Sequence, residues 1–128
     1  MQPAFLHSVF QIVFNEISAA EMSKIDTLEQ LDIFDAFEVS SGDLENLDDE
    51  KYGKIERDGK VLYRFRTDDY RVYFEVVSDS VVIHRVLHKG TLSDFLFRST
   101  LGGKEDEELA HSKHFWNLID EGRNARTV

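Results

Sequence analysis

Three consecutive runs rich in β-branched and aromatic residues constrain the fold of this chain most. They occupy positions 61–66, 70–77 and 81–88. Short polar turns at 67–69 and 78–80 separate them. Runs of this composition, bounded by turn residues, are typical of strands joined by hairpins. We therefore expect these runs to form the centre of an antiparallel sheet.

An Asp58-Gly59 pair predicts a further hairpin just before these runs. A type I′ turn needs positive φ at both central residues, and Asp-Gly accommodates this readily. The pair would join a strand at 53–57 to the strand that begins at Lys60. Near the N-terminus, positions 10–15 predict an earlier strand, because apolar residues alternate along it.

Two helices are expected between the early strand and the hairpin. Ser18 with Glu21, and Thr27 with Gln30, have the spacing of a capping box. The first helix would run to about Ile25 and the second over about 27–38. The second helix is expected to bury Leu28, Leu31 and Phe34, with Phe37 as a fourth candidate. Its acidic residues would face solvent: Glu29, Asp32, Asp35 and Glu38. A further helical turn is expected over 43–47.

Two more helices are expected after the sheet. The first would span 91–101, with Leu92, Phe95 and Leu96 on one side. The second would span 105–121, and four acids in its first turn suit the helix dipole. Its inward-facing residues would be Leu109, Ser112, Phe115, Trp116 and Ile119. Gly122 is expected just past the helix end, and 123–128 as a frayed tail.

The resulting order is β-α-α-β-β-β-β-α-α, which predicts an α+β architecture with a helical hairpin on a mainly antiparallel sheet. A chain of 128 residues is expected to form a single domain. The sequence contains no run of 18 apolar residues, so we expect no membrane-spanning helix. The first residues lack the pattern of a secretory signal. The absence of cysteine excludes disulfides and thiolate metal sites. We expect a cytoplasmic protein.

The net charge of −10 is unevenly distributed. Residues 1–53 hold 2 basic and 12 acidic residues, residues 54–104 hold 10 and 7, and residues 105–128 hold 3 and 6. The middle is therefore a mildly basic segment between acidic arms. Its cations lie on the predicted strands or at their ends: Arg64, Arg66, Arg71, Arg85, Lys89 and Arg98. Such a chain can offer nucleic acid only a local basic patch.

The sheet region resembles the RelE/ParE toxin superfamily of toxin–antitoxin systems. The resemblance rests on the strand Tyr70-Arg71-Val72-Tyr73-Phe74-Glu75, a tight turn, and a strand that ends in His88-Lys89. It covers about residues 9–98. It implies a single RelE/ParE-like domain over 1–128, with a core at about 9–101 and an additional C-terminal helical extension at about 105–122.

The resemblance also implies an activity, that of a RelE-like toxin that inhibits translation as a ribosome-dependent, metal-independent mRNA endonuclease. In that reaction a 2′-hydroxyl attacks the adjacent phosphorus, which requires a base, an acid and cations. By position, the catalytic residues would be Arg71, His88 and Lys89, with Glu75 as a further candidate base. The phosphate-binding residues would be Arg64, Arg66 and Arg85. No cofactor or metal is expected. The expected partners are the ribosome with mRNA, and an antitoxin that lies over the basic face.

The register of the last hairpin decides which side chains share a face. A two-residue turn at Ser78-Asp79 would pair Tyr73 with His84, and would bring His84 and His88 to the open face. A three-residue turn would bring Arg85 there instead, because a slip of one residue reverses every side chain.

A second hypothesis is a non-catalytic protein-binding member of the same fold, of the gyrase-poison type or a degenerate toxin. Gly90 and Thr91 stand where many family nucleases have an arginine, and Phe95 and Phe97 where many have a catalytic tyrosine. The C-terminal helix, with Phe115 and Trp116 to bury, would serve either as a cover for the sheet or as a homodimer contact.

Overall fold

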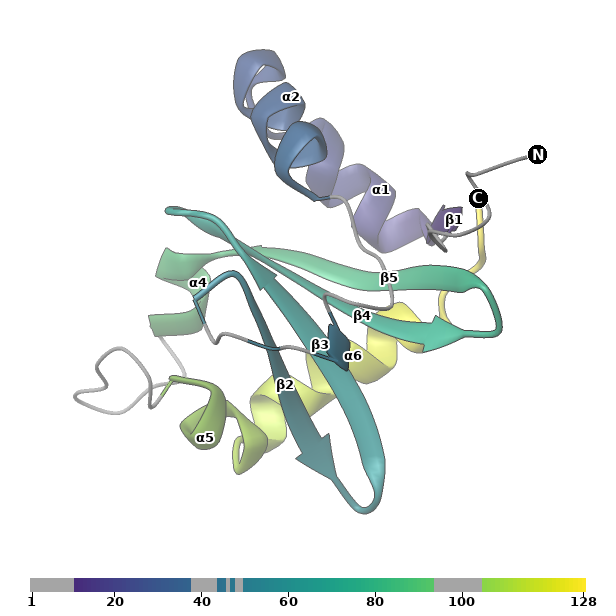
Figure 1. The fold of residues 1–128 in the computed structure, drawn as a ribbon, viewed down its shortest axis with the longest axis vertical. Coiled ribbons are helices and arrows are strands. Elements are labelled where there is room, and N and C mark those ends of the chain that lie inside the picture. The colour runs from purple at the N-terminus through teal and green to yellow at the C-terminus, as the bar shows by residue number, and fades with distance from the viewer. Residues whose placement is uncertain (1–10, 38–43, 46, 48–49, 94–104) are drawn as a thin grey trace.

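A five-stranded mixed sheet organises the chain (Figure 1). The computed structural model describes residues 11–37, 44, 45, 47, 50–93 and 105–128. The strands are β1 (Gln11–Phe14), β2 (Tyr52–Arg57), β3 (Lys60–Arg66), β4 (Tyr70–Val77) and β5 (Ser80–His88). Their order in the sheet is β1-β5-β4-β3-β2. Only the β1–β5 pair is parallel among these strands. The expected α+β class is confirmed.

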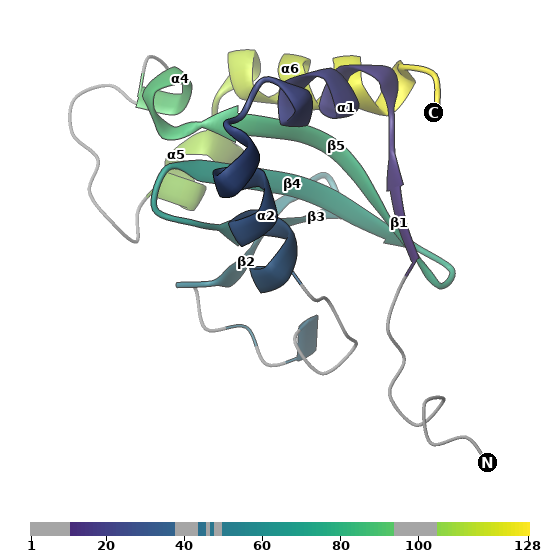
Figure 2. The same ribbon diagram turned by 90° about the horizontal axis from the view of Figure 1, so that it is seen from above.

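Helices cover both faces of the sheet (Figures 1 and 2). They are α1 (Glu16–Ser23), α2 (Thr27–Ala36), α4 (Lys89–Ser93), α5 (Glu105–Ala110) and α6 (Lys113–Asn124). On the α1–α2 face, residues such as Ile33 and Phe37 pack on Phe65 and Phe74. On the α5–α6 face, Phe115 and its neighbours pack on Tyr73. The sheet therefore separates two apolar cores.

Both predicted hairpins around β3 and β4 are confirmed. Asp58 and Gly59 adopt φ of 52° and 81°, so the Asp-Gly pair supplies the two positive φ values of a type I′ turn. Arg57 pairs with Lys60 across this turn. The bounds of β3 and β4 match the sequence expectation.

The expected start of the first helix was wrong by three residues. Asn15 is the N-cap: its side chain accepts from the Ser18 amide at 2.8 Å, and the Ser18 hydroxyl accepts from the Asn15 amide at 3.0 Å. Ser18 thus holds the N3 place of the capping box. The helix ends at Ser23, and Asp26, not Thr27, caps α2.

The inward face expected for α2 was also wrong. Ile33 is buried at 1% exposure, whereas Leu28 is 73%, Leu31 53% and Phe34 40% exposed. Phe37, at the C-cap, is buried as expected. Leu28, Leu31 and Phe34 are three positions apart and therefore lie along one side of the helix. Ile33 lies on a different side, which faces the sheet.

The C-terminal region forms two helices rather than one. A break at His111–Ser112 separates α5 from α6, and Ser112, expected to face inward, accepts from the Phe115 amide as the α6 N-cap. Leu109, Phe115, Trp116 and Ile119 are buried as expected. Because Phe115 and Trp116 pack on the chain's own sheet, the region is a cover. The apolar surface from which a dimer contact was inferred is therefore occupied.

The chain end is also more ordered than expected. Gly122 lies inside α6, where a Cβ would collide with the His84 carbonyl. The Glu16 amide donates to Arg126, and the Val128 amide to Phe14. The supposed tail therefore pairs with the end of β1. The helix expected at 91–101 begins at Lys89, and its positions from 94 onward lie outside the described residues, as do 43 and 46.

Candidate functional site

The predicted site arginines of β3 and β4 lie next to one another in the sheet, and the side chains of Arg64 and Arg71 meet α5. Arg64 is opposite Tyr73, and Arg66 is opposite Arg71 in the β3–β4 ladder. Residues two apart on a strand share a face, so Arg64, Arg66 and Arg71 belong to one row of cations. The shared row follows from the strand pairing; the roles expected for these arginines stay a prediction.

Acidic residues of α5 cover two of these three arginines. The Arg64 side chain is 0% exposed, and its Nε and Nη2 donate to Asp106 at 3.1 and 2.9 Å. Arg71 is 8% exposed, and its Nε donates to Glu105 at 3.0 Å. A guanidinium matches a carboxylate with two parallel hydrogen bonds. Both charges are thus neutralised within the protein.

Gly53 makes room for the buried Arg64 guanidinium. It lies opposite Arg64 in the β2–β3 ladder, and a Cβ at this position would overlap the Arg64 Nη2 atom. Leu109, which is 0% exposed, anchors α5 above this point. The glycine and the leucine together set the depth at which the Arg64–Asp106 pair is buried.

Tyr73 lies between the two ion pairs, and its hydroxyl is buried without a hydrogen-bond partner among the described residues. Burial raises its pKa well above the usual value, and the charges of Glu105 and Asp106 raise it further, against the lowering effect of Arg64 and Arg71. The phenol therefore stays protonated at neutral pH and cannot act as a base.

Glu75, the further candidate base, lies in a second charged cluster on the same face. Its carboxylate accepts from His84 Nε2 at 2.9 Å and from Arg123 Nη2 at 2.8 Å. Burial opposes ionisation of Glu75, but the hydrogen bonds and charges of His84 and Arg123 outweigh it and lower the pKa. Burial lowers the pKa of His84 despite Glu75. Glu75 is therefore an ionised anchor for α6.

A β-bulge sets the register of β5. The turn has two residues, since Val77 pairs with Ser80, but the pairing shifts between Tyr73 and Phe74. Tyr73 consequently pairs with Arg85, and His84 is the extra residue. The expected Tyr73–His84 pair was wrong, because a bulge inserts one residue on one strand. Past the bulge, every side chain is shifted to the opposite face.

His88 therefore lies on the opposite side of the sheet from Arg71. It pairs with Tyr70, which packs with the α1–α2 core, and the two rings meet edge to face at 5.1 Å. Its Nδ1 accepts from the Gly90 amide at 2.9 Å. The catalytic set expected from sequence, Arg71 with His88 and Lys89, is not brought together.

Arg85 and Lys89 also have acidic partners. Arg85 Nε donates to Glu21 at 3.0 Å, and Arg85 Nη1 to Glu121 at 3.2 Å, so it links α1 to α6. Lys89, half exposed, lies 3.2 Å from Asp69. Arg66 lines a hollow of about 390 Å³ between α2 and the β3–β4 turn. The structure thus divides the six predicted site residues among separate places.

One hollow does bring two predicted site residues together. Arg85 and His88 line a space of about 310 Å³ together with Lys24 and Tyr70. Burial raises the pKa of Tyr70, and the charges of Glu29 and Asp69 raise it further. The hollow offers two cations, an imidazole and a phenol on the α1 side of β5, together with the Glu21 carboxylate that pairs with Arg85.

Sequence reasoning missed the acidic partners. Glu105 and Asp106 were assigned only to the helix dipole, and Glu21 to a capping box. The available signal was the run of four acids at 105–108. It is longer than the helix dipole requires, so some of these acids could pair with cations elsewhere in the chain. No sequence pattern shows which arginine each acid meets, since those partners lie 34 and 42 positions away.

Comparison with known proteins gives no relative: no family model, no curated protein and no solved structure matches this chain. Within the described part of the chain, no helix is both long and apolar enough to cross a membrane.

Proposed function

We propose that this protein acts by binding another protein, on a scaffold of the RelE/ParE type, and not by cutting RNA. The observation that carries the proposal is the neutralised basic face. Arg64 and Arg71 would have to hold phosphate, yet each is buried in an ion pair with α5. An RNA backbone would first have to displace these carboxylates.

The separation of Arg71 from His88 supports the same proposal. Cleavage at one phosphate needs the cation and the proton-transfer group within hydrogen-bond reach of the same few atoms. Arg71 lies opposite Leu87 on the α5–α6 face, whereas His88 lies opposite Tyr70 on the other face. One phosphate cannot contact both side chains while the sheet between them is intact.

The test is induction of the protein in bacterial cells, with growth recorded and total RNA followed by primer extension. Wild type is compared with Arg71→Ala and with Arg57→Ala, a half-exposed arginine of β2 outside the row. Growth arrest without new mRNA ends supports binding to a protein target. New ends that appear with wild type and Arg57→Ala but vanish with Arg71→Ala would overturn the proposal.

An mRNA endonuclease is the second candidate, and the hollow with Arg85 and His88 favours it. In that hollow His88 would move the proton and Lys24 would hold the phosphate, with Arg85 joining only once it is released from Glu21. The ribosome, mRNA and an antitoxin would then be the partners. This candidate predicts new RNA ends that are lost in His88→Gln and kept in Arg71→Ala. The same primer-extension series therefore separates it from a nuclease on the α5–α6 face.

A further inference from the structure

The outer face of α2 carries an apolar stripe that the described chain leaves largely exposed. Leu28, Leu31 and Phe34 follow one another at three-residue spacing, with exposures of 73%, 53% and 40%. Ile33, on the other side of the same helix, already anchors α2 to the core at 1% exposure. The stripe is therefore not needed to hold the helix in place.

A hollow adjoins the stripe at Phe34. It measures about 240 Å³ and lies where α1, α2 and β1 meet the chain end. Its lining is mainly apolar and includes Phe14, Ala19, Met22, Phe34 and Val128. Phe14 and Phe34 meet edge to face at 6.3 Å. Stripe and hollow together offer a large apolar side chain a place to insert.

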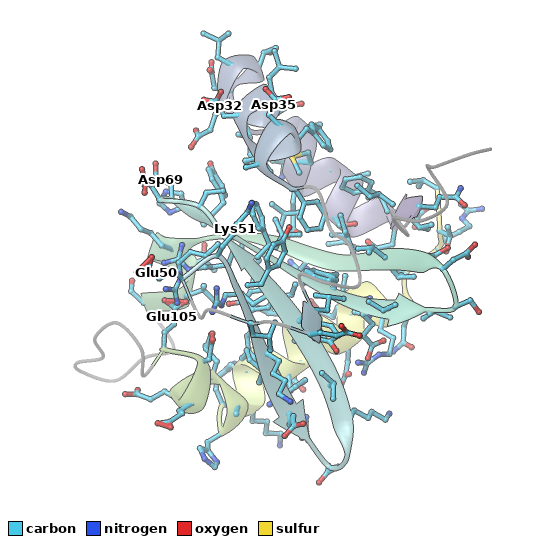
Figure 3. The ribbon with its side chains drawn as sticks, viewed as in Figure 1. Asp32, Asp35, Glu50, Lys51, Asp69 and Glu105 are labelled. Atoms are coloured by element: carbon cyan, nitrogen blue, oxygen red, sulfur yellow. The ribbon has the colours of Figure 1, made fainter. Side chains whose placement is uncertain are left out.

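Acidic side chains border the stripe. Asp32 and Asp35 are exposed on α2, and Figure 3 shows both in the upper part of the view, on the helix that projects from the sheet. Residues 16–36 contain six acids and one lysine. Asp32 lies beside the stripe and Asp35 continues it one turn after Leu31. This acidic edge favours a partner with basic residues next to its apolar ones.

We propose that this face of α2 docks a basic amphipathic helix of a partner protein, with apolar residues on the stripe and lysines or arginines toward Asp32 and Asp35. This rests on the proposed protein-binding function and names the surface that would perform it. A helix laid against a helix presents apolar residues at matching three- and four-residue spacing. Its cations would then meet the acidic edge.

The charge of the surface argues against two other occupants. In a symmetric dimer through α2 the same patch would face itself, so Asp32 and Asp35 would meet acids of the second copy. Like charges placed together oppose association. An anionic membrane surface would be repelled for the same reason, since it attracts basic segments.

The experiment measures binding of a synthetic fluorescent peptide in which leucines occupy helical positions i, i+3, i+4 and i+7 and lysines fill the rest. Anisotropy gives the Kd for the full-length protein. The Leu28→Ser/Leu31→Ser variant is expected to weaken binding about tenfold or more, since both anchors are lost. Asp32→Asn/Asp35→Asn is expected to weaken it less and to reduce its salt dependence. Val77→Ser, an exposed apolar residue at the β4–β5 turn, is the matched control.

Two results would overturn the proposal. One is a Kd unchanged by the leucine variant, and the other is equal binding of a peptide with glutamates in place of the lysines. Light scattering on the wild type and on Leu28→Ser/Leu31→Ser tests whether the protein dimerises through the stripe. A dimer that this variant abolishes would assign the stripe to self-association instead.

The outcome is independent of the primer-extension test. Peptide binding through α2 together with RNA cleavage would support the docking surface and contradict the proposed function. Growth arrest without cleavage, together with no peptide binding, would keep the function and reject this surface.

Discussion

Different interactions stabilise the packing of helices on the two faces of the sheet. On the α1–α2 face, aromatic and aliphatic side chains fill the core, with Phe37 in contact with Tyr52, Phe65 and Phe74. On the α5–α6 face, an apolar centre around Phe115 lies beside buried ion pairs that involve Arg64 and Arg71. The first face is stabilised chiefly by apolar burial, and the second also by buried ion pairs.

This difference shows where sequence tolerance lies. An apolar core accepts other side chains of similar volume. A buried guanidinium is costly once its carboxylate is removed, because the remaining charge has no water around it. Single changes to the buried charged residues of the α5–α6 face should therefore be tolerated less well than changes to the exposed polar residues of α2.

The largest expected effect is the loss of an aromatic ring from either core. Phe115→Ala and Phe37→Ala should each lower the unfolding free energy by about 3–5 kcal/mol, because both rings are buried and leave a cavity. Urea denaturation followed by circular dichroism measures this. Similar losses would show that the apolar parts of both faces are equivalent. A loss below about 1 kcal/mol for Phe115→Ala would mean that α6 packs loosely.

The next effect should be confined to the α5–α6 face. Asp106→Ala leaves Arg64 buried without its carboxylate and should cost about 3 kcal/mol, the low end for a broken buried pair because Asp106 is 16% exposed. The double variant Arg64→Met/Asp106→Leu should recover most of this loss, since apolar residues can replace a buried pair. Urea denaturation of the single and double variants measures both values. A double variant no more stable than Asp106→Ala would contradict the interpretation.

Stability should also fall in acid through the charged cluster of the α5–α6 face. Burial lowers the pKa of His84 in the folded state, so the unfolded chain binds more protons between that value and about 6.5, and stability drops as pH falls through this range. The lowered pKa of Glu75 adds stability that is present above about 4.5 and is lost as pH falls through its folded value.

Urea denaturation at several pH values measures this dependence. His84→Gln should flatten the part that begins near pH 6.5, with His111→Gln, in the exposed break before α6, as the control for loss of a histidine. An unchanged slope in His84→Gln would assign the acid sensitivity to other groups.

The smallest expected effect lies on the outer side of α2. Leu31→Ala should change the unfolding free energy by less than about 0.5 kcal/mol, because a half-exposed residue loses little burial. Ile33→Ala, two positions on, should cost about 2–4 kcal/mol. Thermal unfolding of both variants tests the orientation of α2, and equal losses would contradict it.

The sheet was predictable because its signals are local. Period-two patterns and the Asp-Gly turn placed β3 and β4 within their observed bounds. The buried face of α2 was not predictable from the sequence, because both Ile33 and Leu31 fit a helical apolar pattern. Packing against the sheet decides which of the two is buried. The β5 bulge also escaped prediction, because no residue type marks it, and it separated His88 from Arg71.

The candidate site was predictable only as a row of cations. Arg64 and Arg71 share one face of the sheet because of the β3–β4 register, which the structure supplies. Their neutralisation depends on α5, whose first turn reaches them only through the packing of Leu109. Sequence spacing carries no information about such long-range ion pairs, so an exposed basic face and a covered one have the same local pattern.

The pairing of the chain end with β1 has a consequence for the order of folding. Asn15 bridges to Thr127, and its side-chain amide reaches the Gly122 carbonyl at 2.8 Å. These contacts span more than a hundred positions, so loop-closure entropy delays them until the hairpins between them have formed. During synthesis the row of arginines would therefore emerge before the acids that cover it, and each new molecule would pass through a short interval with an open basic face.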